Sequence, residues 1–388
     1  MFKVLTLNNI SVVGLDRLPR DGYEVASEIQ NPDAILLRSF KMHDMDVPDS
    51  VNAIGRAGAG VNNIPVDKMS GLGIPVFNAP GANANAVKEL VIAGMLLASR
   101  NITGAWDYVQ NLEGTDAELS KKVEAGKKAY KGYELPGRTL GIIGLGAIGV
   151  KLANTAVKMG MNVVGFDPAM TVKNAWQLDA AVDQAVSVDD LMGRCDFISF
   201  HVPLNDHTKN LLNADRIKLL HDGDVVLNFA RGGVVDDAAV MEALDSGKLS
   251  AYVNDFPTNE NKSHPKVIAL PHLGASTDEA EDNCAVMVAD QVRDFLENGN
   301  VVNSVNFPEA IMPRIDGARL AIVNDNVPNM VGQVTGCLAN HSLNIADMLN
   351  KSRGDLAYTL IDLEQTEVGG DVLAELRGIE GVRKVMAL

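Results

Sequence analysis

The sequence contains few cysteines, and it lacks a hydrophobic run that could span a membrane. Its three cysteines, Cys195, Cys284 and Cys337, are scattered and form no CxxC pair. This spacing favours reduced, packed thiols in a cytoplasmic protein over a disulfide framework. The longest apolar run, residues 90–98, falls far short of the ~20 residues that a membrane span requires. The first apolar run, residues 2–7, predicts a strand rather than a signal peptide.

Positive charge is also scarce, because 34 lysines and arginines oppose 50 aspartates and glutamates, for a net charge of −16. This balance argues against nucleic acid and against an anionic membrane surface as partners. It also makes an arginine in a cleft more informative, since an anionic substrate would need local cations. No metal site is predicted, because His201 and His207 have no third ligand at a suitable spacing.

The chain has 388 residues, of which 46% are hydrophobic, enough for two or three domains of the usual ~100–200 residues. Strand and helix patterns alternate through most of the chain, which predicts an α/β fold with parallel sheets. A compact βαββαβ pattern follows near the C-terminus. We predict the first part of a substrate-binding domain at 1–97, a Rossmann-type domain at 98–283, a return helix at 284–305, a linker at 306–316 and a small terminal domain at 317–388.

Residues 139–167 contain the most informative motif of the chain. A short apolar run is followed by a GxGxxG turn, formed by Gly144, Gly146 and Gly149, and then by a helical pattern. A second apolar run ends on Asp167. Strand, glycine turn, helix, strand and acid together form the unit that binds a dinucleotide.

The spacing within this motif predicts NAD as the cofactor. Ala147 and Ile148 begin the helix, so the free N–H groups of its first turn would face the pyrophosphate. Asp167 lies 18 positions after Gly149 (167 − 149), near the ~20 expected for an acid that binds the adenosine ribose hydroxyls. This carboxylate would repel a 2′-phosphate, and residues 168–170 contain no arginine that could bind one.

Later strand patterns end in residues that are suited to hydride-transfer chemistry. Arg231 follows one buried apolar run, and His272 follows another. Ligands of open α/β sheets bind beyond the carboxyl ends of the strands, so we expect both residues at the same edge. An imidazole can exchange the proton of a substrate hydroxyl near neutral pH. A guanidinium can bind a carboxylate through two parallel hydrogen bonds.

A carboxylate near His272 would hold its tautomer and raise its basicity. Asp255 and Glu260 are both candidates, because they share one loop, and the residues alone leave the choice between them open. Arg38 and Arg56 lie near strand ends in the first domain and are candidates for binding an anionic group of the substrate.

These motifs resemble those of the D-isomer-specific 2-hydroxyacid dehydrogenases. Besides the glycine turn, the resemblance rests on segments 58–63, 78–80 with Asn83, 201–204, 230–233 and 271–277. It covers nearly the whole chain. It implies an NAD-dependent enzyme whose Rossmann-type NAD-binding domain is inserted into a flavodoxin-like substrate domain.

The resemblance implies a catalytic trio of Arg231, Glu260 and His272. The histidine would take the proton of the C2 hydroxyl, the arginine would orient the substrate carboxylate, and the glutamate would pair with the histidine. When positions are counted from Arg231, Glu260 and Asp255 keep the family's spacing, and Asp255 is then assigned to the nicotinamide amide. When they are counted from Phe256, Asn259 takes the place of the acid. The further implied cofactor contacts are His201, Val202, Pro203, Phe229, Ala230, Arg231, His272, Gly274 and Ala275. The implied substrate contacts are Arg38, Arg56, Ala59, Gly60, Asn83, Arg231 and His272.

Residues 317–388 resemble an ACT domain, a small-molecule sensor of βαββαβ form. Its presence favours a family member that acts on a phosphorylated 2-hydroxy acid, and it implies an amino-acid effector. Asn324, Asn326 and Asn344 match effector-contacting positions. Asn329 stands where ACT domains often have a glycine before the first helix, and asparagine can adopt the left-handed conformation.

Two other functions remain open at this stage. The chain could be another D-2-hydroxyacid dehydrogenase, of the glycerate or hydroxypyruvate type, or a non-catalytic NAD-sensing regulatory protein of the same fold. The expected assembly is a homodimer or homotetramer in the cytoplasm, with a small-molecule substrate and neither nucleic acid nor membrane as partner.

Overall fold

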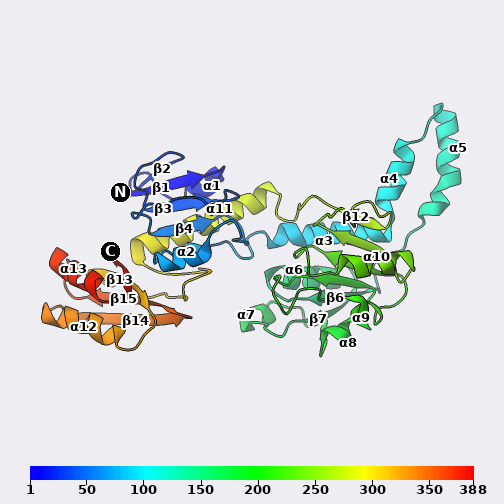
Figure 1. Cartoon of the computed structure of the whole chain (residues 1–388). Coiled ribbons are helices and arrows are strands. Elements are labelled where there is room, and N and C mark those ends of the chain that lie inside the picture. The colour runs from blue at the N-terminus through cyan, green and yellow to red at the C-terminus, as the bar shows by residue number, and fades with distance from the viewer. The chain divides into compact units, whose positions relative to one another are not determined.

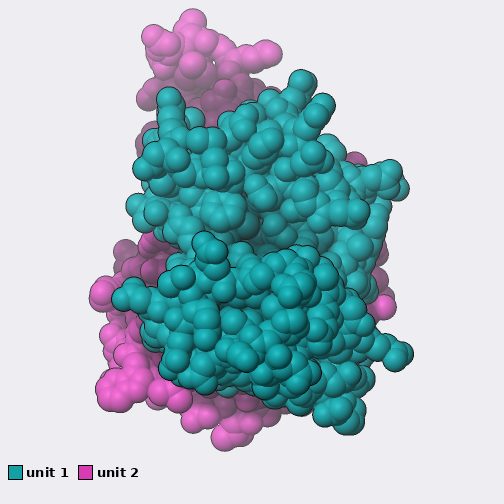
Figure 2. All heavy atoms as spheres, turned by 90° about the vertical axis from the view of Figure 1, so that its left-hand side faces the viewer, with its two compact units in different colours: residues 1–83, 278–388 teal, residues 84–277 magenta.

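The computed structural model describes residues 1–388, which form two compact units. The first unit combines residues 1–83 with residues 278–388, and the second consists of residues 84–277 (Figure 2). None of the helices combines the length and the apolar character that are needed to cross a membrane.

The second unit contains a seven-stranded parallel sheet of the predicted Rossmann type. Its strands are β6 (Thr139–Ile143), β7 (Asn162–Phe166), β8 (Val182–Gln184), β9 (Phe197–Phe200), β10 (Asp224–Asn228), β11 (Leu249–Asn254) and β12 (Val267–Ala269). They lie in the order β12-β11-β10-β9-β6-β7-β8, and every neighbouring pair is parallel. All carboxyl ends therefore meet at one edge, where this class of sheet binds its ligands. The short β8 was not predicted, because it has a single apolar residue, Val182.

The helices of the second unit are α3 (Ala84–Ser99), α4 (Ile102–Gln110), α5 (Asp116–Gly126), α6 (Ala147–Lys158), α7 (Val172–Ala175), α8 (Val188–Met192), α9 (Ala214–Ile217) and α10 (Asp237–Asp245), with a 3₁₀ turn at Lys127–Tyr130. Helix α3 packs against α6 and against β10, β11 and β12. Its Val87, Val91 and Met95 share a hydrophobic core with Leu140 of β6. The division between the units therefore falls at 83/84, whereas the sequence pattern placed it at 97/98. The second division falls at 277/278 rather than 283/284, because helix α11 begins at Asp278.

The first unit contains a five-stranded parallel sheet of flavodoxin-like order, β2-β1-β3-β4-β5. The strands are β1 (Phe2–Leu7), β2 (Tyr23–Ala26), β3 (Ala34–Leu37), β4 (Ala53–Arg56) and β5 (Val76–Phe77), accompanied by α1 (Val12–Leu15) and α2 (Val66–Gly71). Helix α11 (Asp278–Asn298) packs closely on β4. Gly55 permits this contact, since a Cβ there would lie 2.7 Å from Val288 of the helix.

The C-terminal part of the first unit has the predicted βαββαβ order (Figure 1). Its elements are β13 (Arg319–Asp325), α12 (Met330–Asn340), β14 (Ile345–Arg353), β15 (Leu356–Leu363), α13 (Gly370–Gly378) and β16 (Val382–Ala387), and its antiparallel sheet has the order β14-β15-β13-β16. Asn329, directly before α12, is left-handed with φ 69°. Strand β14 is long, but its largely polar and exposed sequence carries little strand signal.

A buried arginine, Arg319, joins the terminal sheet to the rest of the first unit. Its side chain forms an ion pair with Asp362, and the two residues, on β13 and β15, are 0% and 1% exposed. The pair has two hydrogen bonds: Nε donates to Oδ1, and Nη2 donates to Oδ2 at 2.6 Å. The remaining guanidinium donors bond the carbonyl oxygens of Asn298, Met312 and Pro313 at 2.8–2.9 Å. One side chain thus ties the terminal sheet to the end of α11 and to the segment that follows it.

Arg319→Ala tests this anchor. The variant would leave the Asp362 carboxylate buried without its partner, and we expect it to lower the free energy of unfolding of the first unit by about 3–5 kcal/mol. Chemical denaturation would measure the loss. The control is Arg17→Ala, which removes a pair whose side chains are 52% and 42% exposed and should cost less than about 1 kcal/mol. Equal losses in the two variants would contradict the anchoring role.

Candidate active site

The glycine turn after β6 has the tight geometry that the dinucleotide-binding motif requires. Gly144 has φ +96°, and a Cβ there would lie 2.5 Å from the carbonyl oxygen of His201. A Cβ on Gly149 would lie 2.0 Å from the carbonyl oxygen of Gly144, so only glycine allows this close packing. A Cβ on Gly146 would meet nothing within 4 Å. The central glycine therefore faces open space, as it must if a pyrophosphate is to approach the backbone.

Helix α6 begins at Ala147, and Gly146, the residue that caps it, has no side chain to bond its first N–H groups. The N–H groups of a first helical turn have no partner within the helix, and they favour an anion. Ala147 and Ile148, both predicted to contact the cofactor, lie in this first turn. The backbone of α6 can therefore hold a diphosphate without any charged side chain.

Asp167 stands at the end of β7, where the sequence predicted a ribose-binding acid. Its Oδ2 accepts a hydrogen bond from the N–H of Leu145 at 2.8 Å, and its Oδ1 accepts one from Ala169 at 2.8 Å. The carboxylate thereby ties the glycine turn to the neighbouring strand. Sequence reasoning missed this structural role, which sets the position of the acid next to the turn.

His201 directly follows β9, and its backbone lies against the glycine turn. Its ring Nε2 lies 2.9 Å from the hydroxyl oxygen of Ser199, while its Nδ1 is buried without a hydrogen-bond partner. Burial lowers the pKa of His201 to about 4, so the ring is neutral at physiological pH. Val202 also lies against the turn, since its Cγ1 would be 3.0 Å from a Cβ on Gly144. Pro203 follows and is exposed.

Asp255 and His272 come together at the carboxyl edge of the sheet. Asp255, directly after β11, is 1% exposed, and its two carboxylate oxygens accept hydrogen bonds from the N–H groups of Leu273 and Gly274, both at 2.8 Å. His272 itself has a left-handed backbone, with φ 56°. Its ring is exposed and lies 5.0 Å from that of Phe256, between centroids. Asp255 therefore bonds the backbone of the turn that carries His272, and it does not bond the imidazole.

Glu260, the other candidate partner of the histidine, lies in the exposed loop that follows β11. No hydrogen bond or ion pair joins its carboxylate to His272, and the imidazole forms none with any other side chain. Ala275, predicted to contact the cofactor, directly follows the turn that Asp255 holds. The pairing of His272 with Glu260 stays a prediction.

Arg231 follows β10 at the same edge and is exposed, and its Nη1 donates to the carbonyl oxygen of Ala230 at 2.7 Å. Asn228 shapes this loop, because its side chain bonds the carbonyl oxygen of Arg231 at 2.9 Å and the N–H of Ala230 at 3.2 Å. Phe229 is 6% exposed, and its ring would lie 3.0 Å from a Cβ on Gly94 of α3, so it packs into the core. The guanidinium is left at the surface, where it can reach a ligand.

The predicted cations of the first unit lie together at the ends of β3 and β4. Arg56 donates from Nε to the carbonyl oxygen of Arg38 at 3.1 Å. The Nη1 of Arg38 lies 2.7 Å from Oε1 of Glu281 on α11. A Cβ on Gly58 would lie 2.0 Å from Nη1 of Arg56, so this glycine makes room for the guanidinium. Sequence reasoning did not anticipate that Glu281 would partly neutralise this pair.

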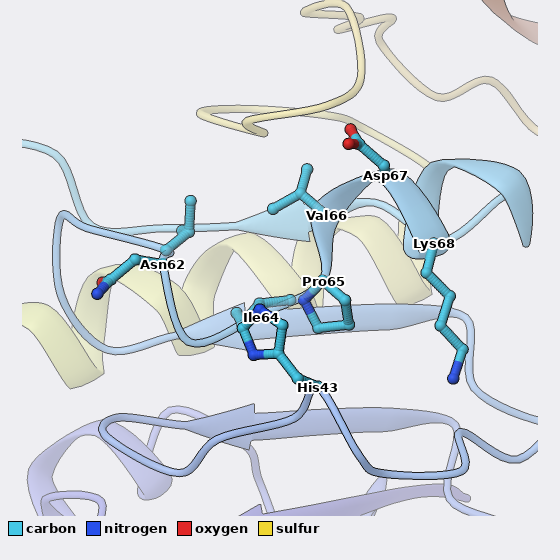
Figure 3. Close-up of a pocket in the computed structure, with 8 residues that line it drawn as sticks. His43, Asn62, Ile64, Pro65, Val66, Asp67 and Lys68 are labelled. Atoms are coloured by element: carbon cyan, nitrogen blue, oxygen red, sulfur yellow. The ribbon is translucent and has the colours of Figure 1, made fainter. Parts of the chain in front are cut away.

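Two other predicted substrate contacts, Ala59 and Gly60, lie in the loop after β4, where the side-chain nitrogen of Asn78 donates to the carbonyl oxygen of Ala59 at 2.6 Å. Asn83 is the last residue before α3. An open pocket of about 620 Å³ is lined by His43 and by residues of the segment 61–68. In Figure 3, His43 points toward Ile64 and Pro65. None of the predicted substrate contacts lines this pocket.

The family to which these features belong is shown by comparison with known proteins. The family profile "D-isomer specific 2-hydroxyacid dehydrogenase, NAD binding domain" matches residues 92–274, which contain the glycine turn, Arg231 and His272. Relatives that match along most of the chain are more than 30% identical to it. The chain belongs to the D-isomer-specific 2-hydroxyacid dehydrogenases, a family of NAD-dependent oxidoreductases.

Within the family, the chain is similar to enzymes named D-3-phosphoglycerate dehydrogenase. It is 34% identical to that of Haemophilus influenzae, over 95% of this chain and 89% of the relative. It is 33% identical to that of Escherichia coli, over 95% of this chain and 90% of the relative. The NAD⁺-bound 3-phosphoglycerate dehydrogenase structure from Entamoeba histolytica has a TM-score of 0.60 and 26% identity, and it covers 79% of this chain and 98% of its own.

The pH dependence of stability tests the neutral state of His201. Its pKa falls from 6.5 to about 4 on folding, so between these values the unfolded chain binds a proton that the native protein does not. Stability is therefore lost as the pH falls through this range, by about 1–3 kcal/mol for this group. We expect His201→Gln to lose correspondingly less stability than the parent in denaturation curves recorded from neutral to acidic pH. The exposed His207→Gln is the control, and a parent-like pH dependence in His201→Gln would refute the assignment.

Proposed function

We propose that the chain catalyses the NAD-dependent oxidation of D-3-phosphoglycerate to 3-phosphohydroxypyruvate, the first step of the phosphorylated route to L-serine. The observation that carries the proposal is the position of Arg231 and His272 at the same sheet edge as the glycine turn. The similarity to phosphoglycerate dehydrogenases along 95% of the chain supports this substrate over other 2-hydroxy acids.

The proposed chemistry assigns one task to each side chain. His272 takes the proton of the C2 hydroxyl, and Arg231 binds the substrate carboxylate through its planar guanidinium. NAD, held by the glycine turn and the first turn of α6, would supply the hydride acceptor for C2. Glu260 pairs with His272 when substrate is bound, since catalytic hydrogen bonds often tighten only in the complex. The cations Arg38 and Arg56 offset the chain's net charge of −16, which would otherwise repel an anionic substrate.

The proposal extends to the assembly and to regulation. Helices α4 and α5 project from the sheet of the second unit (Figure 1), and α4 exposes Trp106, Val109 and Ile102 by 64%, 49% and 43%. Exposed apolar groups of this kind support the predicted homodimer or homotetramer, in which a second copy would cover them.

Unpaired cysteines support a cytoplasmic location. The βαββαβ domain, with Asn324 and Asn326 on and beside β13, is the proposed binding region for an amino-acid effector.

A steady-state assay with NAD and a panel of 2-hydroxy acids tests the activity. We expect D-3-phosphoglycerate to give the highest kcat/KM, ahead of glycerate and lactate. Arg231→Ala and His272→Asn should each lower kcat roughly 10²–10⁴-fold while NADH binding persists. Arg194→Ala, which removes an exposed surface cation, is the matched control. Tight NADH binding with no turnover of any hydroxy acid would instead indicate a regulatory protein.

A comparison of Glu260→Gln with Asp255→Ala tests which acid serves His272. Glu260 is exposed and its carboxylate forms no hydrogen bond or ion pair, so its variant should keep the parent melting temperature but lose roughly 10–10³-fold in kcat. Asp255→Ala removes two buried acceptors and should destabilise the second unit by about 1–3 kcal/mol. Full activity in Glu260→Gln would exclude it as the partner.

A further inference from the structure

A cluster of potential metal ligands lies between the two helices of the terminal domain, α12 and α13, which contact each other (orange and red in Figure 1). Cys337 lies in the last turn of α12 and His341 is the residue that caps this helix, while Asp371 and Glu375 are one turn apart on α13. Residues four apart project from the same side of a helix, so each helix presents a pair of ligands to the other. Neither the dehydrogenase family profile nor the proposed chemistry involves these residues.

The side chains of this cluster already converge on one point. The Sγ of Cys337, a ring nitrogen of His341 and a carboxylate oxygen of Glu375 all lie within 4.8 Å of one another. The Nε2 of His341 is 2.8 Å from Oε2 of Glu375. The Nδ1 of His341 lies 3.7 Å from Oδ2 of Asp371.

We propose that Cys337, His341 and Glu375 form a zinc site that joins α12 to α13. Tetrahedral Zn²⁺ holds thiolate, imidazole and carboxylate ligands about 2.0–2.3 Å from the metal, so the ligand atoms lie about 3.3–3.8 Å from one another. The observed separations bracket this range, and small rotations about the side-chain bonds bring them into it. Three protein ligands leave the fourth position to water.

The chemistry of the ligands selects zinc over the common hard cations. Ca²⁺ and Mg²⁺ bind oxygen ligands, whereas a thiolate and an imidazole favour Zn²⁺. Asp371 occupies the place of the carboxylate that often orients a metal-bound histidine, because it faces Nδ1 while Nε2 faces the cluster. Binding forms the Zn–S bond and releases the proton of the Cys337 thiol to solvent, with no change in oxidation state.

The position of the cluster gives the metal a mechanical role. Cys337 is 5% exposed and belongs to the core in which α12 and α13 cover one face of the terminal sheet. The side chains of His341 and Glu375 are 27% and 49% exposed, so solvent gives the ion a route of entry. A bound ion would fix the spacing of two helices that otherwise contact only through side chains. The proposal is independent of the proposed dehydrogenase activity.

Titration of the full chain with Co²⁺ and Zn²⁺, after removal of metal with a chelator, tests the site. We expect one equivalent of Co²⁺ to produce a thiolate-to-cobalt charge-transfer band together with the intense visible bands of a tetrahedral ion. Zn²⁺ should displace the cobalt and raise the melting temperature. Cys337→Ala should abolish the charge-transfer band, and Asp371→Asn should weaken binding roughly 10-fold.

Matched variants make the result decisive. Cys195→Ala removes another buried cysteine that has no ligand cluster, and it should bind cobalt as the parent does. Glu375→Gln changes an exposed position, so it should fold normally and lose affinity for the metal. The absence of a charge-transfer band in the parent, or a band that persists in Cys337→Ala, would overturn the proposal and leave the cluster as a hydrogen-bonded contact between helices.

Discussion

Two hydrogen bonds from consecutive backbone amides to the carboxylate of Asp255 set the conformation of the segment that carries His272. A carboxylate that is 1% exposed is costly to bury, and the N–H groups of Leu273 and Gly274 offset this cost. They also determine the backbone of His272, which adopts a left-handed conformation that histidine seldom takes. The end of β11 and the end of β12 are thereby joined through one acid. The imidazole lies at the ligand edge of the sheet because the Asp255 carboxylate fixes the backbone of this turn.

The same edge is prepared for the cofactor by glycine and by backbone dipoles rather than by cationic side chains. Gly144 and Gly149 let the chain turn and let α6 pack, and Asp167 secures the turn to β7. A chain with a net charge of −16 can bind a diphosphate in this way because the helix terminus supplies the favourable field locally. His201 stays neutral beside the turn, since burial lowers its pKa.

In the first unit, α11 connects three parts of the structure. Near its start, Glu281 pairs with Arg38, and its middle packs on β4. Near its end, the ring of Phe295 lies 5.6 Å from that of Phe77 and 6.3 Å from that of Tyr358, between centroids. Arg319 then binds the carbonyl oxygen of Asn298 at the last turn. The terminal sheet and the two arginines, Arg38 and Arg56, are thus attached to one continuous helix.

The amino-acid sequence by itself determined the features that depend on local pattern. The GxGxxG turn, the acid at position 167, the strand-end placement of Arg231 and His272 and the terminal βαββαβ order all follow from periodicity and spacing, and the left-handed Asn329 follows from residue type. Tertiary structure decided the rest: the membership of α3 in the second unit, the bonding of Asp255 to the turn rather than to the imidazole, the Arg319–Asp362 pair and the Cys337–His341–Glu375 cluster. The short strands β2 and β8 carry too little pattern to be recognised alone. Distances across packed helices and between neighbouring strands are set by which apolar faces are buried together, and spacing along the chain does not encode them.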